Sequence, residues 1–460
     1  MQTQCNAEQL EFSCIGRRRV VAAFDGGQVS SDAGALLLMR TDRAIGLVDR
    51  LADCFVDRRA RWAIEHSVRT LVAQRVIGIA AGYEDLNDHD ALRSDPLWGA
   101  VMGKLESGRK ECEALAGKST LNRLELSLAD QVSRYHKIGH RAEAIEGLFV
   151  DLFLEAHRKA PRQIVLDLDA TDDPLHGTQE GRFFHGYYDC YCYLPLYIFC
   201  GRHLLAAKLR RADKDGASGA REEVERLVRQ IRERWPKVRI ILRADSGFAR
   251  EELMSWCEQN AVDYVFGLAR NGRLEKRLAG ALREARARAE RTGQAARVFR
   301  EFRYSTIDSW SRRRRVIGKA EQIGEKANPR FIVTSLDRAQ WEGKELYEKF
   351  YCARGEMENR IKEAQLELFA DRTSTHSFRA NQLRLWLASF AYVLVEALRR
   401  IGLAKSSFAL ATAGSIRLKL LKIGAVVSVS VRRVKLAMSS AHPHQAEFIA
   451  AFHALGAAAR

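Results

Sequence analysis

The sequence predicts an α/β protein in which helices cover a mixed β-sheet. Two observations favour this class. From residue 162 to about 270, short apolar stretches rich in β-branched and aromatic residues first follow one another and then alternate with helical patterns. On either side, apolar residues recur at the three- and four-residue spacing of helices. With 460 residues, 47% of them hydrophobic, the chain is expected to form two or three domains or one core with large insertions.

The first region, residues 1–160, is predicted to be mostly helical. Its clearest helical patterns are residues 32–55 and 66–83, where apolar side chains repeat every three or four positions. We find no internal repeat in this region, so it is expected to be a helical domain rather than a repeat array.

Residues 161–270 are predicted to form the first part of a sheet-based core. The expected elements, in order, are strands at 162–170, 191–200 and 203–211, a helix at 219–235, a strand at 238–248, a helix at 250–261 and a strand at 263–270. Strands joined by short turns pair antiparallel, whereas strands separated by a helix are parallel crossovers. A mixed sheet in this order is the ribonuclease H-like arrangement, although a fold alone does not fix a function.

The later part of the chain first interrupts and then completes this core. Residues 271–340 read as a basic helical segment followed by three strand-like stretches, so we expect an inserted α+β domain rich in strands. Residues 341–400 are predicted to return to the core with a long helix and further helices. Residues 401–460 form a C-terminal region, in which 416–435 alternate basic and apolar residues as a terminal hairpin or strand pair would.

The charge of the chain indicates a polyanionic partner. Lys and Arg number 75 against 58 Asp and Glu, which gives a net charge of +17. Residues 271–320 alone contain 15 Lys and Arg against 5 Asp and Glu, or +10 of that charge. Such a concentration of positive charge is typical of proteins that bind nucleic acid. We therefore expect DNA contacts in this segment and in the helical amino-terminal region.

A membrane surface is the other polyanion, and the sequence does not favour it. No stretch reaches the roughly 18 consecutive apolar residues that a spanning helix needs. The longest, residues 385–395, is expected to be a buried helix. The amino end lacks a basic leader followed by an apolar run, and nine scattered cysteines suit reduced thiols. A cytoplasmic protein with no membrane partner is predicted.

Two strands carry acidic residues where a sheet can hold a ligand. The stretch VLDLDATDD, residues 165–173, places its leucines on one face of a strand and Asp167 and Asp169 on the other. Two carboxylates on one side of a buried strand are costly unless a cation compensates them. Asp245 follows the apolar part of another strand, at the carboxyl end where open α/β sheets bind ligands.

The helix that begins near residue 341 carries a third acid. Its stretch YCARGEMENRIKE, residues 351–363, lines up four side chains on one helical stripe. These are Tyr351, Arg354, Glu358 and Lys362. If the helix lies across the sheet, Glu358 approaches Asp169 and Asp245.

Three carboxylates that converge in this way suit magnesium, which prefers hard oxygen ligands. Two such ions, about 3.5 to 4 Å apart, would activate an attacking hydroxyl and stabilise the leaving oxygen at phosphorus. Arg354 would bind a DNA phosphate by forked hydrogen bonds, and Tyr351 would contact sugar and phosphate. The alternative is a structural one: each acid alone is more often a strand-end residue, and the stripe a solvated face with weak charge pairs.

The motifs together resemble a known family. LDLDAT, RADSGF and the spacing Tyr351-x2-Arg354-x3-Glu358 are similar to the DDE transposases of bacterial insertion sequences, in the group with a Tyr, Arg, Glu signature on its last catalytic helix. HGYYDCYCYLPLYIF and the amino-terminal FDGGQVSSDAGALLL and GYEDLNDHDALRSDP resemble the insertion sequence thirteen-eighty-like branch. The resemblance spans nearly the whole chain.

The resemblance implies a ribonuclease H-like endonuclease that cuts double-stranded DNA at terminal inverted repeats and transfers the ends into target DNA. It implies two Mg²⁺ ions, for which Mn²⁺ is expected to substitute, and a homodimer in the synaptic complex. It also implies a bacterial, nucleoid-associated protein. By motif, the catalytic and metal-binding residues are Asp169, Asp245 and Glu358, and Asp167 remains a rival for the first position.

One departure concerns the end of the signature helix. Relatives often have a Lys seven residues after the Glu, whereas this chain has Gln365 there and its nearest Lys is Lys362. A DNA contact by Lys362 is therefore an expectation with less support than one by Arg354.

The basic insertion offers a second set of candidate DNA contacts. Trp310 would stack on a distorted base, and the arginines that follow it would bind phosphates. These arginines are Arg312, Arg313, Arg314 and Arg315. A solvated run of charge is the alternative interpretation.

Two other functions remain open at the level of sequence. A DNA-binding regulator derived from a transposase would bind the same ends without cutting them, although the presence of all three acids speaks against it. A ribonuclease H-like nuclease would cut unrelated DNA as readily as the ends.

Overall fold

The computed structural model of the protein describes residues 8–104, 115–134, 136–430 and 432–459. The chain divides into two compact units. One consists of residues 140–393, and the other of residues 1–139 together with residues 394–460. Each unit is described by itself.

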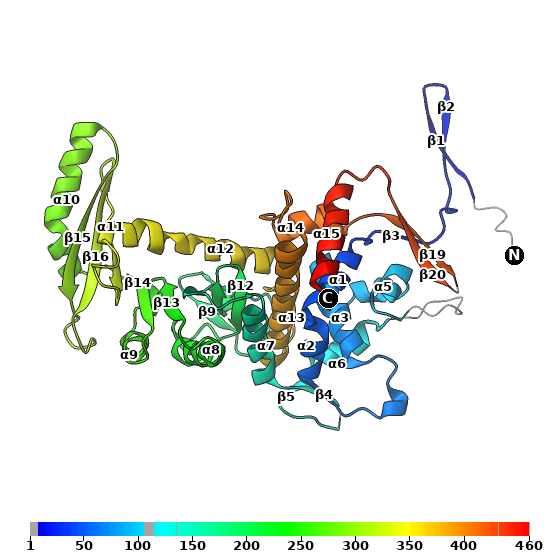
Figure 1. Cartoon of the computed structure of the whole chain (residues 1–460), viewed down its shortest axis with the longest axis horizontal. Coiled ribbons are helices and arrows are strands. Elements are labelled where there is room, and N and C mark those ends of the chain that lie inside the picture. The colour runs from blue at the N-terminus through cyan, green and yellow to red at the C-terminus, as the bar shows by residue number, and fades with distance from the viewer. Residues whose placement is uncertain (1–7, 105–114, 135, 431, 460) are drawn as a thin grey trace. The chain divides into compact units, whose positions relative to one another are not determined.

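A mixed sheet forms the centre of the unit of residues 140–393 (Figure 1). From one edge to the other, its main strands are β12 (His203–Lys208), β11 (Leu196–Cys200), β7 (Gln163–Ala170), β13 (Arg239–Ala244), β14 (Asp263–Leu268), β18 (Arg330–Thr334), β16 (Arg314–Ile323) and β15 (Ala296–Tyr304). β11 pairs antiparallel with β12 and β7, whereas β13 pairs parallel with β7 and β14. The predicted mixed α/β sheet is confirmed.

Side chains that alternate along the strands divide between two hydrophobic cores. Leu166, Ile240 and Leu242 contribute to one core, with apolar residues of four helices. These helices are α7 (Ala142–Glu155), α8 (Ala220–Arg234), α9 (Glu251–Gln259) and α10 (Gly272–Thr292). Ile241 belongs to the second core, with residues of the segment that follows residue 340. Because successive strand residues point to opposite faces, helices cover the sheet on both sides.

The face opposite α7 to α10 is covered by one long helical segment. It comprises α11 (Gly343–Glu345), π-helical turns at Leu346–Tyr351, a short 3₁₀ turn at Cys352–Arg354, and α12 (Gly355–Lys362). Leu346 and Phe350 pack into the second core with Ile241. Figure 1 shows α11 and α12 along one side of the sheet and α8 and α9 on the other. Asp167 and Asp169 point to the α12 side, since Leu166 and Leu168 lie in the first core.

The predicted insertion continues this same sheet. β18 pairs antiparallel with β14 from Val265↔Thr334 to Leu268↔Phe331, and β16 pairs with both β18 and β15. Helix α10 packs Leu274, Leu278 and Ala281 into the first core. The segment therefore has the helix-plus-strands content that the sequence predicts, whereas its treatment as a separate domain stays a prediction.

Shorter elements complete this unit. A small sheet contains β8 (Asp173–Pro174), β10 (Cys190–Tyr193) and β9 (Phe183–His185), in that order. The last helix, α13 (Phe378–Ala397), contains the apolar residues 385–395, and all but one of those are buried. The prediction of a buried helix at that position is confirmed. No helix among the described residues is long and apolar enough to cross a membrane.

The second unit is mainly helical. Its principal helices are α1 (Ala35–Ile45), α2 (Leu47–Asp53), α3 (Val68–Ala81), α4 (Asp88–Leu92), α5 (Pro96–Val101), α6 (Lys118–Glu125), α14 (Ala413–Ile416) and α15 (Gln445–Ala458). Its strands include the hairpins β1 (Leu10–Ile15) with β2 (Arg18–Ala22) and β19 (Ala425–Ser430) with β20 (Arg433–Met438), besides β3 (Val29–Ser30), β4 (Phe55–Asp57) and β5 (Leu128–Ala129). The prediction of a hairpin near 416–435 holds for its later part, and residues 413–421 are helical.

A buried carboxylate joins the two ends of the chain within this unit. Asp32 accepts hydrogen bonds from the Tyr83 hydroxyl at 2.5 Å, the Trp98 indole at 2.9 Å and the Lys422 ammonium at 2.7 Å. Asp32, Tyr83 and Trp98 lie in or beside the two amino-terminal motifs. In this structure those motifs build a polar core, and full pairing makes such burial tolerable.

Candidate active site

Asp169 and Asp245 lie side by side at the ends of two parallel strands. In the register of β7 with β13, Ala244 is opposite Leu168, so the next residue of each strand is one of the two acids. Asp245 directly follows β13 and caps the 3₁₀ turn Ser246–Phe248, where its Oδ1 accepts a hydrogen bond of 2.9 Å from the Gly247 amide. The adjacent parallel strands thus bring both carboxylates to one edge of the sheet, as expected for an α/β ligand site.

The helical segment across the sheet brings Glu358 to the same place. Arg354 and Glu358 are four residues apart, and the Arg354 Nη2 donates to Glu358 Oε1 at 2.8 Å. The other guanidinium nitrogen, Nη1, donates to Asp169 Oδ2 at 3.1 Å. One arginine therefore bridges an acid of the sheet and an acid of the helix.

All three predicted acids line one cavity of about 700 Å³. Arg354 and Lys362 are the two lysine or arginine residues among its described lining residues. The structure thus brings together Asp169, Asp245 and Glu358, which lie 76 and 113 residues apart in sequence. The three acids therefore share one cavity, and their action as one catalytic site stays a prediction.

The surroundings of Asp169 favour its protonated form more than water would. Burial raises the pKa of Asp169 to about 6, and the nearby negative charges of Asp245 and Glu358 act in the same direction, whereas Arg354 lowers the pKa. The influence of both other acids shows that the three carboxylates are electrostatic neighbours. A cation in the cavity is what such a group of charges needs.

Tyr351 supports the site from the side of the helix. A Cβ atom added to Gly267 on β14 would lie 2.6 Å from the Tyr351 hydroxyl and 2.8 Å from the Ser246 amide nitrogen. The absence of a side chain at Gly267 therefore lets the tyrosine approach the turn that follows Asp245. Burial raises the pKa of Tyr351, and the negative charge of Asp245 raises it further.

Asp167, the rival for the first position, already has a fixed partner. Arg243 donates from Nε to Asp167 Oδ1 at 2.5 Å and from Nη2 to Oδ2 at 2.8 Å. Both carboxylate oxygens are engaged, and Asp167 is buried. Its pKa is nevertheless raised by burial, against the opposing effect of Arg243. These contacts favour Asp169 as the acid that faces the cavity.

Sequence reasoning did not identify three aromatic residues that also line the cavity. These residues, His185, Tyr187 and Tyr188, belong to the β9–β10 hairpin. Tyr187 is 85% exposed to solvent. Burial raises the pKa of Tyr188 to about 12, with smaller contributions from Asp172 and Asp169. The only signal in the sequence was the aromatic run HGYYDCYCYLPLYIF itself, which the resemblance marked without assigning a role.

The end of the signature helix reaches the same cavity. Lys362 is exposed and lines it, and Gln365 lines it as well. The Gln365 side-chain amide donates to the main-chain oxygen of Asp172 at 3.1 Å. Position 365 therefore makes a neutral contact with the loop after β7.

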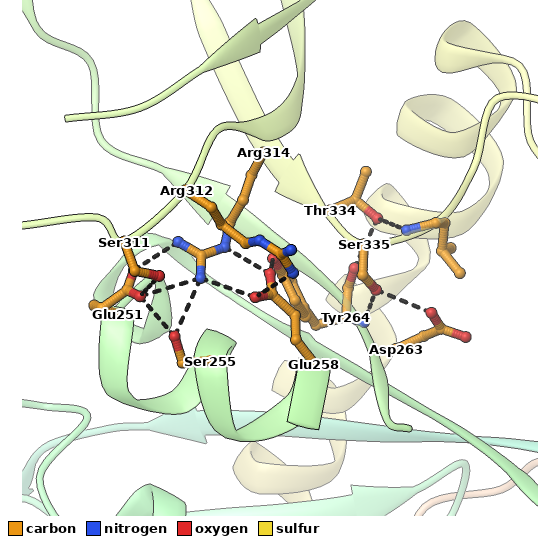
Figure 2. A network of polar contacts seen from close by, with 11 residues as sticks. Glu251, Ser255, Glu258, Asp263, Tyr264, Ser311, Arg312, Arg314, Thr334 and Ser335 are labelled. Carbon is orange, nitrogen blue, oxygen red and sulfur yellow. Dashed lines mark hydrogen bonds and ion pairs between the residues drawn. The ribbon is translucent and has the colours of Figure 1, made fainter. Parts of the chain in front are cut away.

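The predicted arginine run divides into buried and exposed members. Figure 2 shows the polar contacts of Arg312 and Arg314. Arg314 is 2% exposed and lies between Glu251 and Glu258 of α9, and it donates to each of them. Although burial opposes ionisation, the hydrogen bonds from Arg314, Ser255 and Ser311 lower the pKa of Glu251 to about 2. Arg314 thus ties β16 to α9 inside the protein.

Arg315 is also an interior residue. It donates to Glu301 at 2.9 Å and to the main-chain oxygens of Leu336 and Trp341 at 2.9 and 2.8 Å. The structure therefore gives Arg314 and Arg315 partners within the fold, where a DNA phosphate does not reach without breaking those contacts. The interpretation of the run as one solvated surface does not apply to these two residues.

Arg312, Arg313 and Trp310 lie nearer to the surface. Arg312 and Arg313 are exposed, and Arg312 contacts Glu258 at 3.4 Å. Both line a cavity of about 640 Å³ that Arg239 and Arg303 also border. Trp310 is partly buried, edge to face with Tyr304 at 5.7 Å between ring centres. Of the four arginines, Arg312 and Arg313 are therefore the two that are exposed, and a DNA contact by them stays a prediction.

The cavity offers oxygen donors of the kind that bind divalent metal ions. Three carboxylates line the cavity, and carboxylate oxygens are the ligands that Mg²⁺ prefers. Among the residues that the structure describes, no three His, Cys, Asp or Glu side chains are grouped closely enough to hold a metal ion. The kind of donor therefore suits Mg²⁺, whereas the donors are not grouped around one point in this structure, where Arg354 binds two of them.

A family model described as transposase DDE domain group 1 matches residues 12–459, which is nearly the whole chain. A search of curated proteins finds no match.

Proposed function

Because this chain belongs to the transposase DDE domain group 1 family, we propose that it cuts DNA at the ends of an insertion sequence and joins those ends to target DNA. The family makes it a transposase and implies DNA partners. The observation that carries the finer proposal is that Asp169, Asp245 and Glu358 line one cavity, although they come from two strands and a helix. We assign these three residues to catalysis and metal binding.

The strand order supports a ribonuclease H-like core. On one side of β7 lie the antiparallel strands β11 and β12. On its other side lie β13 and β14, which run parallel to it. This is the arrangement predicted from the order of elements in the sequence. The insertion sequence thirteen-eighty-like branch and the Tyr, Arg, Glu signature group are part of the same proposal, on the motifs alone.

Members of the family generally use divalent metal ions, and Asp169, Asp245 and Glu358 would hold them here. When bound, two Mg²⁺ ions would lower the pKa of the attacking hydroxyl and offset charge on the leaving oxygen. Mn²⁺ is expected to substitute, because it accepts the same oxygen ligands.

The remaining residues of the cavity would position DNA. Arg354 has a planar guanidinium that suits a phosphate, and Lys362 adds an exposed positive charge at the same wall. Tyr351 lies beside Gly267 and the turn after Asp245, so we assign it to holding that turn as well as to contacting DNA. Asp167 and Arg243 would not take part directly, because they bind each other.

DNA outside the cavity would meet the exposed arginines of the insertion. Arg312 and Arg313 border the cavity of about 640 Å³ with Arg239 and Arg303, and phosphate binding needs such a cluster of accessible positive charge. We do not include the buried Arg314 and Arg315 in this surface. A DNA contact by Trp310 is proposed from its place in the basic segment. A homodimeric synaptic complex and a bacterial nucleoid-associated location are proposed from the family alone.

A plasmid assay separates this function from its two rivals. One plasmid would carry the inverted repeats that flank the gene, and a matched plasmid would carry scrambled repeats. The proposal predicts Mg²⁺-dependent nicks confined to the repeat ends and the appearance of joined products in a target plasmid. Binding without nicks would indicate a regulator, and equal cutting of both plasmids would indicate a nuclease.

A further inference from the structure

The guanidinium of Arg354 binds two of the proposed metal ligands at once. Its Nη1 binds Asp169 Oδ2 at 3.1 Å and its Nη2 binds Glu358 Oε1 at 2.8 Å. The arginine side chain is 19% exposed, so the contact is mostly shielded from water. A guanidinium carries donors only and stays charged, which makes it a lasting counter-ion for two carboxylates.

A metal ion and Arg354 would compete for the same oxygens. Mg²⁺ binds carboxylate oxygens at about 2.0 to 2.1 Å in near-octahedral geometry, and its charge and the charge of the guanidinium compete for the same two carboxylates. Asp169 Oδ1 already accepts a hydrogen bond from the Ala170 amide at 3.0 Å, so Oδ2 is the oxygen that faces the cavity. In this structure Asp169 Oδ2 and Glu358 Oε1 thus both have the guanidinium of Arg354 as their positively charged partner.

The cavity also offers the arginine another partner when DNA enters. A DNA phosphate in the cavity would carry the negative charge and the two-oxygen geometry that a guanidinium fork prefers. Glu358 is 46% exposed, so its ion pair with Arg354 is partly screened by water and readily exchanged. The helix that carries both residues need not move for the arginine side chain to turn from a carboxylate to a phosphate.

We propose that Arg354 is an internal counter-ion that holds Asp169 and Glu358 together before DNA binds, and that it transfers to a DNA phosphate and so frees the two acids for metal. This inference rests on the proposed catalytic function of the cavity. Metal binding then follows DNA binding. Because linkage is reciprocal, DNA tightens metal binding by the same factor as metal tightens DNA binding.

The experiment measures Mn²⁺ affinity directly, from the paramagnetic resonance signal of the free ion. The full-length chain is titrated alone and with a DNA duplex that carries the flanking repeats. Arg354→Gln removes the positive charge but keeps a polar side chain. Arg360→Gln is the matched control, because Arg360 lies on the same helix and binds Glu363 at 3.1 Å. Thermal unfolding checks that both variants fold.

The wild type and the Arg360→Gln control should bind Mn²⁺ weakly without DNA and about tenfold or more tightly with DNA. This factor corresponds to the free energy of the charged hydrogen bonds that Arg354 gives up when it leaves the two acids. Arg354→Gln should bind Mn²⁺ tightly even without DNA, and DNA should add little. Equal Mn²⁺ affinity of wild type and Arg354→Gln, with and without DNA, would overturn the exchange. The proposed function would survive that outcome if Glu358→Gln abolished the binding of Mn²⁺ in the presence of DNA, because Glu358 would then still be a metal ligand. No Mn²⁺ binding by any form, together with no cleavage, would overturn both.

Discussion

Arg243 donates hydrogen bonds from Nε and Nη2 to the two carboxylate oxygens of Asp167, at 2.5 and 2.8 Å. The same guanidinium donates from Nη1 to the main-chain oxygen of Phe350, at the end of the π-helical turns. One side chain therefore joins β7, β13 and the helical segment that carries Arg354 and Glu358. This contact fixes the third acid relative to the first two.

Replacing Arg243 should loosen this junction. Arg243→Met leaves Asp167 buried without its cation, and loss of one partner of a buried ion pair costs about 3 to 5 kcal/mol. Chemical denaturation would measure the fall in the free energy of unfolding. Arg239→Met is the matched control on the same strand, because Arg239 and its partner Asp263 are partly exposed, and it should cost about 1 kcal/mol or less. Equal losses for the two variants would contradict the assignment.

A methyl group at Gly267 should disturb the turn after Asp245. Gly267→Ala places a Cβ 2.6 Å from the Tyr351 hydroxyl and 2.8 Å from the main-chain nitrogen of Ser246. The backbone at Ser246 cannot rotate away as a side chain could. Overpacking of this kind costs about 1 to 3 kcal/mol and should also reduce cleavage. Gly280→Ala is the control: its Cβ meets nothing within 4 Å, and the helix should gain about 0.5 to 1 kcal/mol.

The network around Arg314 should make stability depend on pH. The folded pKa of Glu251 lies near 2, below its ordinary value of about 4.5, so the network stabilises the fold fully above pH 4.5. That stability is lost as the pH falls from about 4.5 towards 2. Arg314→Met should destabilise the protein most at neutral pH, and the difference from wild type in the free energy of unfolding should shrink over this window. A difference independent of pH would contradict the role of the ion pairs.

The exposed arginines should contribute to DNA affinity rather than to stability. Arg313→Ala should leave the unfolding free energy within about 0.5 kcal/mol and weaken binding to all DNA sequences alike. Each lost phosphate contact lowers the slope of log K against log salt by about 0.9. A salt titration of DNA binding by the wild type and the variant measures this slope. An unchanged slope would remove Arg313 from the proposed DNA surface.

Much of the fold followed from local patterns. The alternation of apolar and acidic residues in β7 gave its two faces, and the order of strands and helices gave the mixed sheet. The choice between Asp167 and Asp169 did not follow, because a period of two puts both on one face. It depends on Arg243, which lies 76 residues from Asp167 and reaches it only through the pairing of β7 with β13.

The arginine run shows the same limit. All four arginines of the run were expected to bind DNA or to form a solvated run of charge, yet Arg314 and Arg315 are both buried. Their partners, Glu251 and Glu258 for one and Glu301 for the other, come from α9 and β15. Local sequence cannot show that a charge will find a buried partner on a distant element. The link from Arg354 to Asp169 was hidden for the same reason.

The central claim is that Asp169, Asp245 and Glu358 act as one site. The most direct test measures Mg²⁺-dependent cleavage of a plasmid with the flanking repeats by Asp169→Asn, Asp245→Asn and Glu358→Gln, with binding of the same DNA as the control for folding. Each variant should lose more than the roughly 10- to 100-fold that an outer partner of a metal costs, while still binding the DNA. Cleavage within about twofold of wild type by any of the three, a change of less than about 0.5 kcal/mol in barrier, would contradict the account.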